Sequence, residues 1–168
     1  MSSHAARQSH SKPVVLIASQ FHPVIARALV RGATTVLSRA GVSRARVRLL
    51  WAPGAFELPV IAARLARRRP RPQAIIALGA LIRGDTPQYE VLAHAVVQGL
   101  VRVAVDTGIP VTCGVIVATT LAQAKARAGL PAPRSAYHRK ARQAGGAMGN
   151  RGAEAAAAAL EVLRLFER

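Results

Sequence analysis

An uncharged apolar run, Ala74–Ile82, ends abruptly in the polar loop Gly84-Asp85-Thr86-Pro87. A run of this kind is typical of a strand that is buried on both faces of a parallel sheet. Open α/β sheets bind ligands just beyond the carboxyl ends of such strands. A glycine-containing loop there exposes backbone N–H groups, and the helix that follows directs its positive dipole end at the same place. The run therefore predicts a site for a small phosphorylated ligand at this loop.

Strand and helix patterns alternate along the rest of the chain. Short apolar or alternating segments predict further strands at Val14–Ser19, at 46–52 and at 111–117,. In the second of these, alternation places Val47, Leu49 and Trp51 on one face,. Helical spacing and end signals predict helices at 23–40, 56–69, 89–107, from Thr119 or Thr120 to residue 128, and from about 152 to 166,. This order predicts an α/β fold of three layers around a four-stranded parallel sheet.

Size and composition favour one folded domain. A chain of 168 residues, of which 51% are hydrophobic, can bury a core of its own and is not disordered as a whole,. The single cysteine, Cys113, excludes a disulfide framework, and the apolar runs are too short to cross a bilayer,. The first residues lack the apolar core of a signal peptide. We therefore expect a cytoplasmic protein with a disordered tail at 1–12, one domain at 13–168, and a basic insert at about 130–149.

The formal net charge of +17 allows two interpretations. Arginine clusters within 64–71 and 134–142 could attract nucleic acid or another polyanion,. Alternatively, the arginines cover solvated faces without any partner. Aromatic residues for base stacking are scarce and no nucleic-acid-binding motif is present, which favours the second interpretation,. The absorbance of the purified protein after a high-salt wash would separate the two, because phosphate contacts are strongly salt-dependent.

Four segments, in order, resemble the lumazine synthase family. They are Pro53-Gly54-Ala55-Phe56-Glu57-Leu58-Pro59, the stretch from Ala77 to Pro87, Ala126-Arg127-Ala128-Gly129, and Asn150-Arg151-Gly152-Ala153-Glu154. The resemblance implies a flavodoxin-like fold and a transferase of riboflavin biosynthesis without a metal or organic cofactor. Such an enzyme condenses 5-amino-6-(D-ribitylamino)uracil with 3,4-dihydroxy-2-butanone 4-phosphate. The family forms pentamers, or shells of pentamers, with sites between neighbouring subunits.

The resemblance also implies roles for particular residues. Phe21 would stack on the uracil ring, although position alone favours a side chain that fills the core. Glu57 would accept hydrogen bonds from the ribityl hydroxyls, or it would simply complement a helix dipole. The remaining substrate contacts would come from Ala55, Phe56, Ala80, Leu81, Ile82 and Cys113.

The implied phosphate site combines a loop with a distant cation. Asp85 would contribute its backbone N–H, and Thr86 would donate both its hydroxyl and its N–H. Arg127 would supply planar donors suited to two contacts with a phosphate dianion. Arg151 stands where the family has a lysine and is a further accessory candidate.

Gln88 departs from the family pattern, which has a histidine at this position as the proton-transfer group. An amide does not take up or release a proton at useful pH, and general acid–base help is worth roughly 10²–10⁴ in rate. Alignment of the substrates supplies about 7–11 kcal/mol on its own. The expectation is therefore a slow enzyme, which a Gln88→His substitution should accelerate. The alternatives are a paralog that binds a ribityl-pyrimidine or flavin-type ligand without efficient turnover, and a shell that collects nucleic acid. His22 and His138 are accessory candidates for the missing imidazole.

Overall fold

A computed structural model describes residues 12–131 and 149–167 of the chain. The predicted tail up to residue 11, most of the predicted insert, and His138 lie outside the described residues. Leu130, which begins the predicted insert, belongs to the folded part because it packs against the core.

Four parallel strands form one sheet in the order β2-β1-β3-β4. The strands are β1 (Val14–Ser19), β2 (Val47–Ala52), β3 (Ala74–Ile82) and β4 (Val111–Ala118). β1 and β3 lie in the middle and are almost entirely buried, as their uninterrupted apolar sequences predict,. Leu16 aligns with Leu49 on one side and with Ile76 on the other, and Ala77 aligns with Cys113. The predicted α/β fold with a parallel sheet is confirmed.

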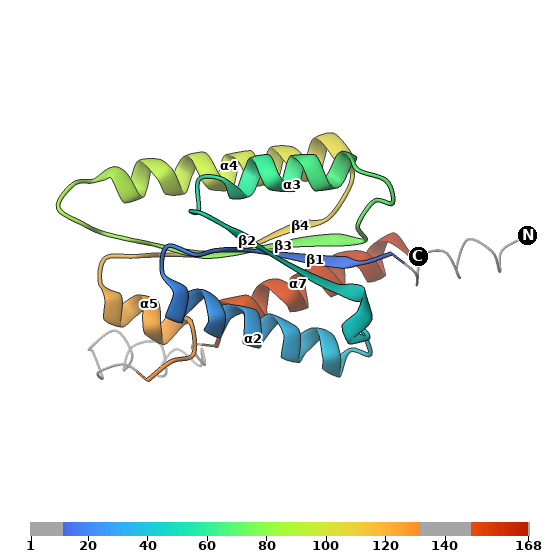
Figure 1. Cartoon of the computed structure of the whole chain (residues 1–168), viewed down its shortest axis with the longest axis horizontal. Coiled ribbons are helices and arrows are strands. Elements are labelled where there is room, and N and C mark those ends of the chain that lie inside the picture. The colour runs from blue at the N-terminus through green and yellow to red at the C-terminus, as the bar shows by residue number, and fades with distance from the viewer. Residues whose placement is uncertain (1–11, 132–148, 168) are drawn as a thin grey trace, which may run out of the picture.

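Helices cover both faces of this sheet, which gives three layers (Figure 1). One face carries α2 (Pro23–Arg39), α5 (Leu121–Arg127) and α7 (Arg151–Phe166), and the other carries α3 (Leu58–Arg67) and α4 (Gln88–Thr107). A short 3-10 turn, Arg44–Arg46, precedes β2. Each face of the sheet packs against its helices through a separate hydrophobic core. Alternate residues of β1 belong to the two cores, since Leu16 packs on the side of α2 and α7 and Ile17 on the side of α3 and α4,.

Helix ends follow the local signals in the sequence closely. Gly41 and Gly108 adopt φ values of +82° and +67° just beyond α2 and α4, the left-handed conformation that glycine reaches without strain,. The Thr120 hydroxyl accepts a hydrogen bond from the N–H of Gln123 at 3.2 Å and so caps α5,. α4 begins at Gln88, one residue earlier than predicted, with Pro87 at its N-cap.

β2 and β4 are the two edge strands, and β2 is the more exposed of them. Leu49, Leu50 and Trp51 are each about two-fifths exposed, at 38%, 41% and 40%. Within residues 12–131 and 149–167, no helix is long and apolar enough to span a membrane.

Candidate functional site

The carboxyl ends of β1, β2 and β3 surround a pocket of about 440 Å³, which we call the loop pocket. Since the strands are parallel, the loops that leave them meet at one edge of the sheet,. The loop pocket gathers most residues that the sequence predicts for a ligand site: Phe21, His22, Ala55, Phe56, Ala80, Leu81, Ile82, Thr86 and Gln88.

Two aromatic side chains in the loop pocket are unusually accessible. Phe21 is 75% exposed and Phe56 is 60% exposed, whereas Ala55 and Ala80 are buried beneath them. The alternative in which Phe21 fills the core is therefore wrong for this chain. Exposed aromatic faces above a floor of small residues suit a flat ring, because the ring can stack on the aromatics while small side chains leave it space.

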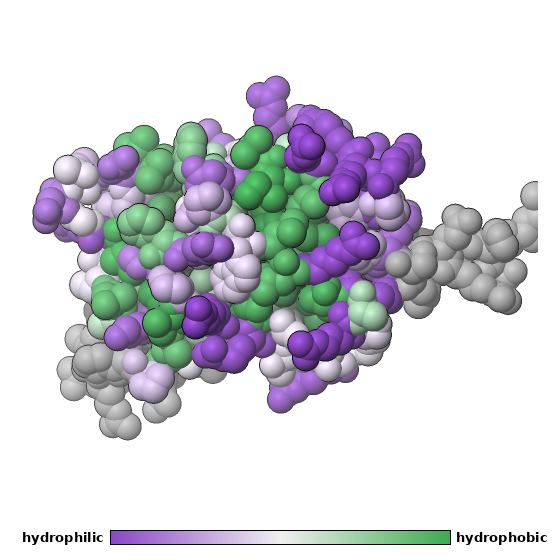
Figure 2. Space-filling model, viewed as in Figure 1, coloured by the Kyte–Doolittle hydropathy of each residue, from purple (hydrophilic) through white to green (hydrophobic). Residues whose placement is uncertain are grey.

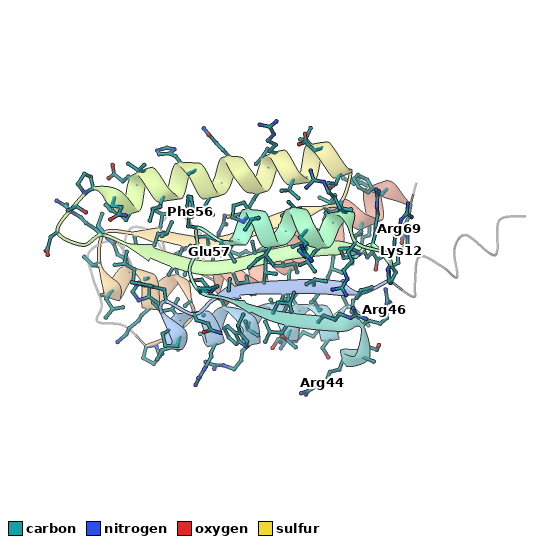
Figure 3. The ribbon with its side chains drawn as sticks, turned by 45° about the horizontal axis from the view of Figure 1, so that its top comes forward. Lys12, Arg44, Arg46, Phe56, Glu57 and Arg69 are labelled. Atoms are coloured by element: carbon teal, nitrogen blue, oxygen red, sulfur yellow. The ribbon has the colours of Figure 1, made fainter. Side chains whose placement is uncertain are left out.

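Glu57 lies at the rim of the loop pocket rather than within its lining. Its Oε2 atom is 2.8 Å from the position that a Cβ would take at Gly54, which lines the pocket. Any other residue at position 54 would displace this carboxylate. Figure 3 shows Phe56 and Glu57 side by side between β2 and α3, and Glu57 also borders a smaller pocket with Pro59 and Val60.

The loop between β3 and α4 presents free backbone donors. None of the hydrogen bonds within the described part of the chain uses the N–H of Gly84, Asp85 or Thr86. Gln88 follows as the first residue of a helix of 20 residues, whose positive dipole end points at this loop,. Thr86 and Gln88 line the loop pocket, while Asp85 is exposed beside it. The arrangement suits an anion, as the sequence predicts.

A second pocket, of about 600 Å³, lies along the edge strand β4, and we call it the edge pocket. Three predicted site residues line it: Cys113 from β4, Arg127 from the end of α5, and Arg151 from the start of α7. Arg127 and Thr86 thus line different pockets in one copy of the chain. Their predicted meeting around one phosphate, at a site between neighbouring subunits, therefore stays a prediction.

Glu154 ties the two arginines of the edge pocket together. One of its oxygens, Oε2, accepts hydrogen bonds from Arg127 Nη2 at 2.9 Å and from Arg151 Nη1 at 3.1 Å. Burial by itself raises the pKa of the Glu154 carboxyl, but the hydrogen bonds and charges of both arginines outweigh burial, and the pKa is lowered,. Two guanidinium groups share one carboxylate, so positive charge remains at the pocket wall.

Two residues that sequence reasoning assigned no role belong to the site region. Tyr89 lines both pockets, and its hydroxyl donates to Glu90 Oε1 at 2.7 Å. Glu154 holds Arg127 from 27 positions away. The sequence held a signal for both. Tyr89 directly follows Gln88, and Glu154 lies three positions after Arg151, which places the two side chains one helical turn apart,.

Basic side chains gather at the opposite end of the sheet from the loop pocket. Figure 3 shows Lys12, Arg44, Arg46 and Arg69 there, away from Phe56 and Glu57. Arg46 Nη2 donates to the Lys12 carbonyl at 3.1 Å and to Gln73 Oε1 at 2.8 Å, so this arginine also ties the chain together locally. Nucleic-acid binding through the arginines within 64–71, one of which is Arg69, stays the less favoured hypothesis. Across the described ranges, no group of three His, Cys, Asp or Glu side chains is placed to hold a metal ion.

Comparison with known proteins agrees with this geometry. The sequence model of the family described as 6,7-dimethyl-8-ribityllumazine synthase matches residues 11–167. The protein of that name from Gemmatimonas aurantiaca is 40% identical over 161 residues, which cover 96% of this chain and 88% of the relative. Proteins of the same name from Nitratidesulfovibrio vulgaris and Leuconostoc mesenteroides are 39% and 32% identical, over 91% and 94% of this chain and 87% and 90% of their own lengths.

Proposed function

The chain belongs to the 6,7-dimethyl-8-ribityllumazine synthase family, and from this premise we propose the reaction and the residues that perform it. The protein is a transferase of riboflavin biosynthesis. It condenses 5-amino-6-(D-ribitylamino)uracil with 3,4-dihydroxy-2-butanone 4-phosphate and releases phosphate and water. The observation that carries the assignment of the site is the loop pocket, which collects residues from three separate loops.

The loop pocket binds the pyrimidine. The exposed ring of Phe21 stacks on the uracil, and the backbone groups of Ala80, Leu81 and Ile82 meet its polar edge,. These residues need no polar side chains for that purpose, which is consistent with their apolar sequence. The ribityl chain then extends past Ala55 and Phe56 toward the Glu57 carboxylate, which accepts hydrogen bonds from its hydroxyls.

The phosphate of the second substrate lies on the loop before α4. The N–H groups of Asp85 and Thr86, the Thr86 hydroxyl and the dipole of α4 favour a dianion there,. Its counter-charge comes from Arg127 of a neighbouring copy, because the Arg127 of the same copy faces the edge pocket instead. The backbone of Cys113, near the uracil, and the accessory cation Arg151 come from the neighbouring copy in the same way.

This division of the site requires an assembly. The loop pocket and the edge pocket are different surfaces, so a contact that joins them is head-to-tail, and such contacts form a closed ring when the rotation between subunits closes. A pentamer, or a shell built from pentamers, satisfies this condition, with each site completed between two subunits. The described residues, 12–131 and 149–167, supply both half-sites.

Gln88 sets the rate of this enzyme. At the first turn of α4 it lies beside Thr86 in the loop pocket, where its amide orients the substrate or a water molecule. It cannot exchange a proton at neutral pH, so turnover is slow relative to an enzyme with an imidazole at this position. The non-catalytic alternative is less favoured, since all three relatives described above bear the synthase name.

A two-substrate assay tests the function directly. The purified protein should form lumazine, followed by its absorbance, only when the phosphorylated ketone is present, and faster than the same mixture without protein. An Arg127→Gln variant should reduce kcat/KM for the ketone phosphate by roughly 10- to 100-fold, because one or two charge-assisted hydrogen bonds are lost. An Arg102→Gln variant is the matched control, since Arg102 is exposed on α4 and lines neither pocket. A wild-type rate equal to the protein-free rate would refute the assignment.

A further inference from the structure

The loop pocket contains a histidine in addition to its stacking and backbone groups. His22 lines this pocket together with Thr86, Gln88 and Tyr89. It is the only side chain in the lining whose ordinary pKa lies near neutrality, and Tyr89 is the only other titratable side chain there,. His22 is therefore the one lining side chain that is suited to accept and donate protons at neutral pH.

The local structure leaves the His22 ring available. His22 is the N-cap residue of α2, yet its side chain makes no capping hydrogen bond. Its ring meets the ring of Phe21 edge-on, with centroids 5.1 Å apart and planes at 82°. Within the described residues, neither ring nitrogen is engaged in a hydrogen bond. The contact with Phe21 fixes the imidazole beside the face on which the pyrimidine stacks.

The other polar groups of the pocket are unsuitable for proton transfer. The Gln88 amide neither gains nor loses a proton at useful pH. The hydroxyl of Tyr89 is engaged by Glu90, and that hydrogen bond, with burial and the Glu90 charge, raises the pKa of Tyr89 despite the opposing charge of Arg83. Condensation of an amine with a ketone nevertheless needs a proton to leave nitrogen and a proton to reach oxygen.

We propose that His22 is the catalytic proton-transfer residue of this enzyme, an inference that rests on the proposed function. As the 5-amino nitrogen bonds to the ketone carbon, the imidazole accepts one proton from this nitrogen and passes it to the former carbonyl oxygen, which becomes a hydroxyl. The imidazole then accepts the second proton of the nitrogen and passes it to that hydroxyl, which departs as water while the C=N bond forms. The cycle ends with His22 neutral, and no oxidant or reductant is consumed.

The electrostatic surroundings of His22 favour its neutral form. Burial lowers the pKa of His22 below its ordinary value of 6.5,. The charged or titratable side chains on the segments that line the loop pocket are Glu57 after β2, Arg83 and Asp85 after β3, and Tyr89 and Glu90 on α4. None of them contributes to this shift. The imidazole is thus uncharged at pH 7 and ready to accept a proton, and kcat should rise with pH through a pKa below 6.5.

The decisive experiment compares pH–rate profiles of three proteins. In the wild type, kcat should climb between about pH 5 and 7 and then level off. In His22→Gln, kcat should fall about 100-fold or more with little change in KM, and the climb should disappear. His94→Gln is the control, because His94 is exposed on α4 and lines neither pocket. Adding Gln88→His to the His22→Gln variant should restore a pH-dependent rate.

The outcomes separate this inference from the function on which it rests. If the wild type produces no lumazine above the protein-free rate, the proposed function fails. If the wild type is active but its profile is flat from pH 5 to 7, His22 is not the proton-transfer group, whatever the variants do. A His22→Gln variant that keeps the wild-type kcat and profile, or loses only substrate affinity, overturns the inference equally.

Discussion

A single carboxylate organises the basic wall of the edge pocket. Glu154 accepts from Arg127 and Arg151 at once, although the side chains of Arg127 and Arg151 are still 29% and 41% exposed. With Glu154 in place, Arg127 is held in one orientation, which would reduce the entropy lost on binding the proposed phosphate. The Arg127 guanidinium would then exchange the Glu154 carboxylate for the phosphate, or be shared between them, and no mobile side chain would have to be ordered.

The lowered pKa of Glu154 predicts a specific dependence of stability on pH. A carboxyl whose pKa is depressed by folding stabilises the folded state above its ordinary pKa of 4.5, and this stabilisation is lost as pH falls through the folded value,. Glu154→Gln should therefore lower the free energy of unfolding by about 1 kcal/mol at pH 7, given partial exposure, and by less at pH 3. Urea unfolding at both pH values measures this difference.

Glu161→Gln provides the control for that measurement. Glu161 lies on the same helix and pairs with Arg164 at 3.1 Å, but both side chains are more than half exposed, at 61% and 65%. Its replacement should change stability by a few tenths of a kcal/mol at most at either pH. Equal effects of the two substitutions would contradict the role assigned to Glu154.

At the scale of elements, the start of α7 is the best-fixed point near the site. The Asn150 side chain caps α7 by accepting from the N–H groups of Gly152 and Ala153 at 2.9 and 3.1 Å,. Its amide also donates to the carbonyls of Ala28 at 2.9 Å and Ala128 at 2.6 Å. One residue thus joins α7, α2 and the end of α5. The positions of Arg151 and Arg127 follow from this junction.

The close approach of α7 to α2 makes Gly152 irreplaceable. A Cβ at this position would lie 2.2 Å from the Leu29 carbonyl oxygen and 2.7 Å from its carbon. Because these are backbone atoms, the helices would have to separate. Gly152→Ala should lower the free energy of unfolding by about 2 kcal/mol or more, although alanine is favoured over glycine in an exposed helix by about 1 kcal/mol.

Ala157→Gly serves as the comparison for that substitution, and chemical denaturation measures both. Ala157 is exposed in α7, so its replacement reports helix propensity alone, with an expected loss of about 1 kcal/mol,. A stabilising effect of Gly152→Ala would mean that α2 and α7 can move apart. The junction at Asn150 would then not fix the positions of Arg127 and Arg151.

At the scale of the whole molecule, the two edges of the sheet are unequal. Figure 2 shows a hydrophobic area across the middle of one face, over α3 and β2, between more hydrophilic ends. The exposed Leu49, Leu50 and Trp51 of β2 belong to this edge, whereas the other edge carries the edge pocket beside β4. Exposed apolar surface of this kind is typical of a protein–protein interface, and we expect it to be covered in the proposed head-to-tail ring.

Trp51→Arg should break the assembly without unfolding the subunit. Trp51 is 40% exposed and contributes to the edge, so a charge there costs little in a monomer but would be buried in a ring,. Light scattering should give an oligomer for the wild type and a much smaller particle for the variant. Activity should fall with assembly, since each site needs two copies. An exposed-site control, Arg102→Gln, should leave the mass unchanged.

The sequence by itself determined the local elements and their class. The uncharged run at Ala74–Ile82, the glycines at 41 and 108, and Thr120 each act within a few residues, so periodicity and end signals were enough to place strands and helices,. The pairing of parallel strands then follows from the alternation of elements, and their carboxyl ends must share one edge.

Only the tertiary structure decided which predicted site residues lie together. Strand order β2-β1-β3-β4 puts β4 at one edge, so Arg127 turns into the edge pocket while Thr86 faces the loop pocket. The tertiary structure also leaves Phe21 exposed and places Glu154 in contact with Arg127. His22 and Gln88 line the same pocket. These relations join residues far apart in the chain, and they depend on packing between whole layers, which no local pattern of residues encodes.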